Sequence, residues 1–228
     1  MLRRITLIAI LACFVALPVG AGVIIGNISA GSTQVDGTGI GDGASKAAGW
    51  TMPSGTNYSL DSVTLDLRYN YWYFGTGLPA PVVTAAIYGD SGSGPTGSAL
   101  VTLTDPSFVR SNTADYNYVF TPPSAFTLTA GTTYWLVLSA TDPSGNNQDD
   151  INWRMSSPSM ISPSGIATSA GYRWNNSGVV PPLGSSSTYN TFEVDGTAQA
   201  SPVPEPATML LAAAGLSVVL LRRRQLRR

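Results

Sequence analysis

The feature that most constrains the fold of this chain is a series of short segments in which apolar and polar residues alternate. In YSLDSVTLDLRY every second residue from Val63 to Tyr69 is apolar, whereas Leu60 falls in the polar set. A period of two places alternate side chains on opposite faces of a β-strand. The segment 58–69 therefore predicts a strand with one buried face.

Similar segments follow along the chain: VVTAAIY, ALVTLT, YNYVFT, AFTLT, TTYWLVLSA, INWRM, GYRWN and TFEVDG. TTYWLVLSA is apolar on both faces, which predicts a central strand. The chain has 24 glycines and 16 prolines, and its central region has no convincing helical period. We therefore expect an all-β fold, an antiparallel, jelly-roll-like β-sandwich of about nine to eleven strands. Ala130–Gly131 predicts a tight hairpin turn, and GTGIGDG (37–43) predicts a flexible loop.

The first 21 residues have the three regions of a secretory signal peptide. Arg3 and Arg4 precede an apolar run of 13 residues, and small residues then favour cleavage by signal peptidase after Ala21. A retained membrane anchor and a lipoprotein signal at Cys13 remain alternatives. We therefore expect an N-terminal signal helix within 1–21, which is removed on maturation, and a domain that begins at residue 22.

Composition excludes several functional classes. The chain has no histidine, and its single cysteine, Cys13, lies in the signal region. Disulfides, zinc–thiolate clusters and His-dependent triads are therefore excluded from the mature chain. Between Gly22 and Ser201 there are five basic and twelve acidic residues, which disfavours nucleic-acid binding. We expect no cofactor and no enzymatic activity; a hydrolase relying on Asp or Glu alone is the alternative, and adjacent Ser45 and Lys46 do not by themselves predict a catalytic pair.

Two segments offer candidate ligand sites. The aromatic run YNYWYF (69–74) includes Tyr71, Trp72 and Tyr73, whose rings are of the type that stacks on sugars, although packing explains the same residues. The segment DPSGNNQDD (142–150) is rich in oxygen ligands for calcium, although a solvated loop has the same composition. The weak calcium candidates are Asp142, Asn146, Asp149 and Asp150.

The C-terminal segment 201–228 differs from everything before it. Prolines alternate with other residues over 202–206 and favour an extended chain, and 15 uncharged residues (207–221) follow. As a helix this run reaches about 22 Å, which is short of a bilayer core of about 30 Å. The arginines that follow predict that this end stays in the cytoplasm and that the domain faces outward. They are Arg222, Arg223, Arg224, Arg227 and Arg228.

This tail closely resembles the PEP-CTERM sorting signal. The match comprises Val203, Pro204, Glu205 and Pro206, then the apolar run, then the arginines. The resemblance implies recognition by a membrane-embedded exosortase of a Gram-negative bacterium and removal of the helix. It also implies a transient inner-membrane anchor, a final place in the envelope or extracellular matrix, and association with exopolysaccharide and biofilm. An ordinary tail anchor is the alternative.

The central region, 22–200, resembles the choice-of-anchor R family of bacterial surface domains. TLTAGTTYWLVLSA is the most specific segment, and the likeness covers roughly Val23 to Ala198. It implies an extracellular β domain without catalytic residues to carry over. The insertion YNYWYFGTGLPAP departs from the family. The leading interpretation is an exported, non-enzymatic surface or matrix protein; the alternative is a carbohydrate-binding module that uses the aromatic loop.

Overall fold

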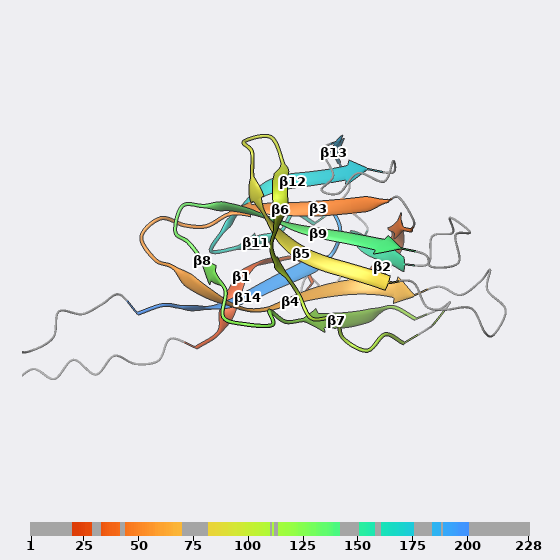
Figure 1. Cartoon of the computed structure of the whole chain (residues 1–228). Helices are drawn as coiled ribbons and strands as arrows, with labels where there is room; N and C mark the ends of the chain where they lie inside the picture. Colours follow the sequence, from red (N-terminus) through yellow and green to blue (C-terminus); the bar gives the residue numbers. More distant parts are fainter. Residues whose placement is uncertain are drawn as a thin grey trace, which may run out of the picture. The chain divides into compact units, whose positions relative to one another are not determined.

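The computed structural model describes residues 20–28, 33–41, 44–69, 82–109, 111, 114–141, 151–157, 161–175, 184–187 and 189–200. All of these residues except Ala200 belong to a compact unit that spans Val19–Gln199. They form fourteen strands and no helix, in two antiparallel sheets that lie one above the other (Figure 1). The strands are β1 (Gly22–Gly26), β2 (Thr33–Ile40), β3 (Ser45–Thr51), β4 (Tyr58–Tyr69), β5 (Val82–Asp90), β6 (Pro95–Thr102), β7 (Tyr116–Phe120), β8 (Thr127–Leu128), β9 (Thr133–Thr141), β10 (Ile151–Ser157), β11 (Ser164–Gly165), β12 (Thr168–Asn175), β13 (Gly184–Ser186) and β14 (Phe192–Ala198).

The eight-stranded sheet is organised around β4. Its order is β11-β1-β14-β4-β10-β2, and β7 and β8 pair with β4 outside this path. β14 pairs with the first part of β4, as far as Leu65, and β10 pairs with the last part, from Leu67 to Tyr69. The long β4 therefore pairs with four strands of one sheet, β14, β10, β7 and β8.

Two buried asparagines lie at the junction beside β4 between the strand β10 and the strand β14. Asn190 donates from Nδ2 to the carbonyl oxygen of Trp153 at 2.6 Å. Asn27 accepts the backbone N–H of Phe192 at 2.9 Å and donates to the carbonyl oxygen of Ile161 at 2.9 Å. These side chains make hydrogen bonds to backbone groups that regular strand pairing does not satisfy at this junction. Buried backbone N–H and C=O groups need such partners.

The six-stranded sheet has the order β13-β12-β3-β9-β5-β6, with β9 in its interior. Tyr134, Leu136 and Leu138 of β9 face the main core between the sheets, while Trp135 and Val137 are buried in a smaller cluster on the other face. The prediction that this segment is a central strand with two buried faces is confirmed.

The main core confirms the predicted buried face of β4, but it also contains Leu60, which was expected on the opposite face. Val63, Leu65 and Leu67 are fully buried, and Leu60 is buried with them, at 2 % exposure. The pairing with β14 skips Asp61, so β4 has a bulge at this position. One extra residue shifts the alternation by one, and Leu60 therefore turns inward instead of staying with the polar set.

Other expectations need correction. Fourteen strands occur in the described part of the chain, more than the nine to eleven expected, because the sequence named no strand at β1, β2, β3, β11 or β13. Residues 37–40, predicted as a flexible loop, belong to β2 and pair with β10. Gly131 has the positive φ expected of its turn, at 69°. However, the turn joins β8 of one sheet to β9 of the other, so it is not a hairpin. The jelly-roll-like connectivity stays a prediction.

Candidate functional site

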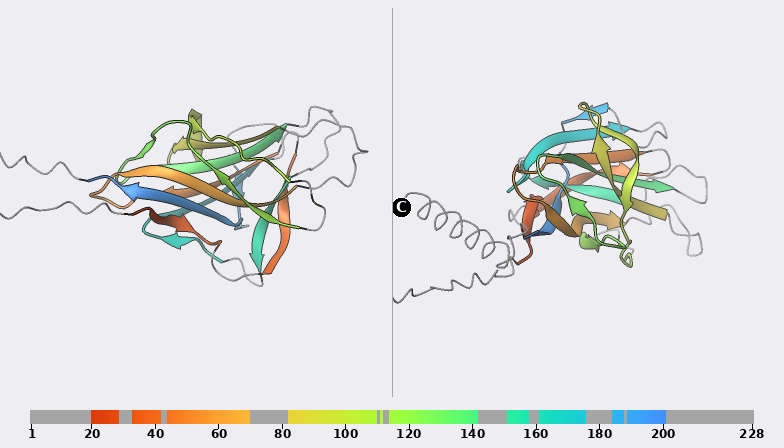
Figure 2. Two further views of the ribbon diagram at one scale, coloured as in Figure 1. Left: turned by 90° about the horizontal axis from the view of Figure 1, so that it is seen from below. Right: turned by 60° about the vertical axis from the view of Figure 1, so that its left-hand side comes forward.

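The two ends of the domain leave the eight-stranded sheet side by side. β1 and β14 are antiparallel neighbours, and Gly22, the first residue of β1, pairs with Gly196 near the end of β14 (Figure 2). Ala21 is exposed and lies immediately before β1, whereas Ile24 and Ile25 within β1 are fully buried. Cleavage after Ala21 would therefore cut an accessible segment and leave the buried strand whole.

The chain stays anchored to the domain almost up to the predicted sorting tail. Ala198 pairs with Tyr58 at the start of β4. Gln199 then donates its backbone N–H to the carbonyl oxygen of Asn57 at 2.8 Å, and its side chain donates to the Thr127 hydroxyl at 3.0 Å. The predicted tail, which begins at residue 201, therefore starts directly at this end of the sandwich. Its motif residues 203–206 and its arginines lie outside the described residues.

The two predicted ligand loops are rooted together at the opposite end of β4. Tyr69, the last residue of β4, pairs with Ile151, and Val82 pairs with Thr141. The pair Tyr69–Ile151 lies in the eight-stranded sheet, and the pair Val82–Thr141 lies in the six-stranded sheet. The chain therefore passes from one of these pairs to the other twice, through 70–81 and through 142–150. β4 has 12 residues, so at about 3.3 Å per residue these roots lie about 36 Å from the tail end.

The structure places the first aromatic residue of the loop in the core. Tyr69 is 3 % exposed, and its ring stacks on Phe108 with the ring centroids 6.1 Å apart. Tyr71, Trp72 and Tyr73 lie outside the described residues. So do the calcium candidates Asp142, Asn146, Asp149 and Asp150. Within the described ranges, no group of three or more His, Cys, Asp or Glu side chains could hold a metal ion.

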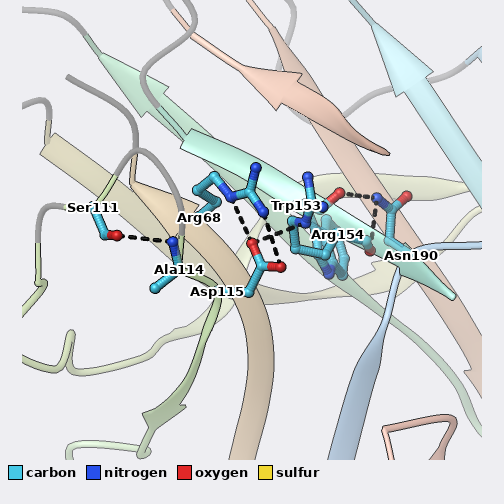
Figure 3. A network of polar contacts seen from close by, with 7 residues as sticks. All are labelled: Arg68, Ser111, Ala114, Asp115, Trp153, Arg154 and Asn190. Atoms are coloured by element: carbon cyan, nitrogen blue, oxygen red, sulfur yellow. Dashed lines mark hydrogen bonds and ion pairs between the residues drawn. The ribbon is translucent and has the colours of Figure 1, made fainter. Parts of the chain in front are cut away.

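A charged network that sequence reasoning missed lies beside these loop roots (Figure 3). Asp115 Oδ1 accepts from Arg68 Nε at 2.7 Å, and Oδ2 accepts from Arg68 Nη2 at 3.1 Å. Arg154 Nε lies 3.0 Å from the same Oδ1, in an electrostatic contact rather than an aligned hydrogen bond. Ser111 accepts the N–H of Ala114 at 2.8 Å, which shapes the approach to Asp115. The network ties the segment before β7 to the roots on β4 and β10.

A second unpredicted pair lies in the six-stranded sheet. Lys46 of β3 is 1 % exposed, and its Nζ donates to Ser186 Oγ of β13 at 2.9 Å. The Nζ atom also lies 5.9 Å from the ring centroid of Tyr172. Burial lowers the pKa of Lys46 from 10.5 to about 7, because the charged form loses its hydration. The two partners are 140 positions apart in the sequence, so no local pattern could predict this pair.

Comparison with known families identifies the tail. Residues 202–225 match the PEP-CTERM protein-sorting motif. The prediction of this motif is confirmed, and it marks the chain as an exported protein of Gram-negative type that exosortase processes at the membrane. Among the residues that the structure describes, no helix is long and apolar enough to cross a bilayer, and the predicted span 207–221 lies beyond them. Comparison with curated proteins gives no match.

Proposed function

We propose that this chain is a non-enzymatic component of the cell envelope or extracellular matrix, delivered there by signal peptidase and then exosortase. The observation that carries the proposal is the sorting motif at residues 202–225. Its central domain is of the choice-of-anchor R type, and its destination implies association with exopolysaccharide and biofilm. After processing, the domain alone remains outside the inner membrane.

The paired exits of β1 and β14 support this route. Because Gly22 and Gly196 are neighbours, the two predicted processing sites follow from the same end of the domain. The loop roots at Tyr69 and Val82 lie at the other end of the sandwich.

Intact-mass analysis of the protein recovered from its own envelope tests the proposal. We expect a mature chain that begins at about residue 22 and ends near the motif, without 207–228. Glu205→Ala should leave an uncut, membrane-held form, because the motif that exosortase recognises is damaged. Deleting 222–228 should let the chain pass through the membrane and escape processing. Glu193→Ala is the control, since Glu193 lies in β14 and outside the motif. A mature protein that retains 210–228 contradicts the proposal.

A second candidate function is carbohydrate binding by the aromatic loop. The observation that favours it is the common root of the aromatic and oxygen-rich segments, through the pairs Tyr69–Ile151 and Val82–Thr141. Aromatic rings bind the apolar faces of sugars, and an adjacent calcium site would supply oxygen-coordinated recognition.

A glycan array combined with thermal shift, with and without calcium, tests this second function. Trp72→Ala should abolish glycan binding and leave the melting temperature of the free protein unchanged. Tyr116→Ala is the matched control, because Tyr116 is an exposed aromatic residue of β7 outside the loop. Equal loss of binding in both variants, or no glycan bound by the parent protein, refutes it.

A further inference from the structure

The end of the domain where β1 begins and β14 ends is built from uncharged residues. Backbone hydrogen bonds join the segments that meet there: the Gly131 N–H donates to the Pro53 carbonyl oxygen at 3.1 Å, and the Gln199 N–H donates to that of Asn57 at 2.8 Å. Figure 1 shows the connections from β3 to β4 and from β8 to β9 at this same end. We call it the uncharged end; its segments are 20–24, 51–58, 125–132, 165–168 and 196–200, and none of them contains Asp, Glu, Lys or Arg.

The absence of charge is a property of this end and not of the whole domain. Between Gly22 and Ser201 the chain has five basic and twelve acidic residues, and the charged network of Figure 3 lies beside the loop roots at the other end of β4. Asp61, Asp90 and Asp195 border the uncharged end on its sides. Each of these carboxylates accepts a hydrogen bond from a neighbouring hydroxyl or indole group.

The uncharged end presents apolar side chains to its surroundings. Ile166 is 48 % exposed and Val23 is 43 % exposed. The rings of Tyr58 and Phe126 are half-buried at the same end. Aromatic rings that are partly buried and partly wet are typical of membrane–water interfaces. A surface of this kind can enter a lipid headgroup layer without the cost of desolvating a charge.

The chain that follows Gln199 limits how far this end can lie from a bilayer. Gln199 is the last residue of the described chain with a hydrogen bond to the domain. The predicted apolar run begins at residue 207, so the connection spans at most about 28 Å when fully extended. Before the signal is removed, the connection from the other predicted apolar run to Gly22 spans at most about 17 Å. Short connections raise the effective concentration of lipid at this end, so a weak contact is sufficient.

We propose that the uncharged end is a contact surface for the zwitterionic headgroup layer of a phospholipid bilayer before the chain is cut. The inference rests on the proposed function, because it requires the tail to enter a membrane. Only four residues separate Gln199 from Pro204, so the contact keeps the sorting motif close to a membrane-embedded processing enzyme. The bordering carboxylates restrict the contact to the end itself, because a charged group is costly to bring into the headgroup layer.

Fluorescence quenching in lipid nanodiscs tests the contact with the full chain. Discs of phosphatidylcholine that hold one chain each are prepared with and without a lipid that carries a nitroxide on its headgroup. Cys13→Ser removes the native thiol, and Ser54→Cys places a thiol-reactive fluorophore on an exposed position of the uncharged end. Thr141→Cys is the matched label site, because Thr141 is also exposed but ends β9 beside the loop roots. We expect the nitroxide lipid to lower the emission of the label at position 54 at least about twofold and to leave the label at position 141 unchanged.

A charge placed on the uncharged end should break the contact. Ile166→Asp should restore the emission of the label at position 54, because the carboxylate is expelled from the headgroup layer. Val119→Asp is the matched control, since Val119 is 49 % exposed but lies on β7, and it should leave the quenching unchanged. Equal emission of the label at position 54 with and without the nitroxide lipid overturns the proposal. Equal quenching of the two labels, or an equal effect of the two Asp variants, overturns it as well.

This result and the sorting result are independent. Discs with one chain each contain no second copy and no processing enzyme, so quenching reports a contact with lipid alone. A mature protein that retains its tail contradicts the sorting proposal and leaves the lipid contact in place. A label at position 54 that the nitroxide lipid does not quench has the opposite meaning.

Discussion

Replacing Lys46 with methionine should stabilise the domain in a pH-dependent manner. The side chain is 1 % exposed, and burial lowers its pKa to about 7 in the folded state from the ordinary value of 10.5 that it has in the unfolded chain. Between these values the unfolded chain binds more protons than the folded one, so the stability of the parent protein rises with pH. Below about pH 7 both states carry the charge, and the folded state bears the full cost of burying it.

The magnitude follows from the pKa difference. Each pKa unit corresponds to about 1.4 kcal/mol, so the cost of the buried charge reaches about 5 kcal/mol below pH 7. Methionine fills a similar volume without a charge, but it gives up the hydrogen bond to Ser186, worth about 1 kcal/mol. We therefore expect Lys46→Met to gain about 2–4 kcal/mol at pH 6 and to lose that advantage as the pH approaches 10.

Urea unfolding of residues 22–200 of both proteins, followed by circular dichroism at several pH values, measures this difference. Subtracting the two curves cancels every titration that the variants share, including those of the tyrosines. A difference that is constant from pH 6 to about pH 9.5 would refute the reasoning, because a neutral contact alone gives no slope. A variant that is less stable at pH 6 would refute it as well.

Two further predictions concern packing and charge. Gly49→Ala should lower the free energy of unfolding by about 1–3 kcal/mol, because the added Cβ would lie 2.7 Å from the Trp135 ring. Gly89→Ala is the control, because its added Cβ would meet its nearest atom only at 4.0 Å. Urea unfolding followed by tryptophan fluorescence compares the two variants. Equal costs would contradict the close packing. In the same assay Asp115→Asn should lower the free energy of unfolding by about 2–4 kcal/mol, because the buried Arg154 loses the negative charge of Asp115. An unchanged free energy of unfolding would show that the ion pair does not stabilise the fold.

Several local features could be predicted from the sequence. Alternation identified the buried face of β4 from Val63 onward, and apolar residues on both faces identified β9 as a central strand. The sorting tail was also predicted, because its proline motif, apolar length and arginines are contiguous. These features depend on residues close together in the chain, where a period of two or a run of one composition is sufficient evidence.

The tertiary structure decided which distant residues meet. Backbone hydrogen bonds are the same for every residue type, so nothing local states that β10 and β14 share β4, or that Asp61 forms the bulge that turns Leu60 inward. The pairing of Lys46 with Ser186 likewise depends on β3, β12 and β13 lying side by side. The glycine-rich β2 was missed because its pairing with β10, rather than any pattern of its own, makes it a strand.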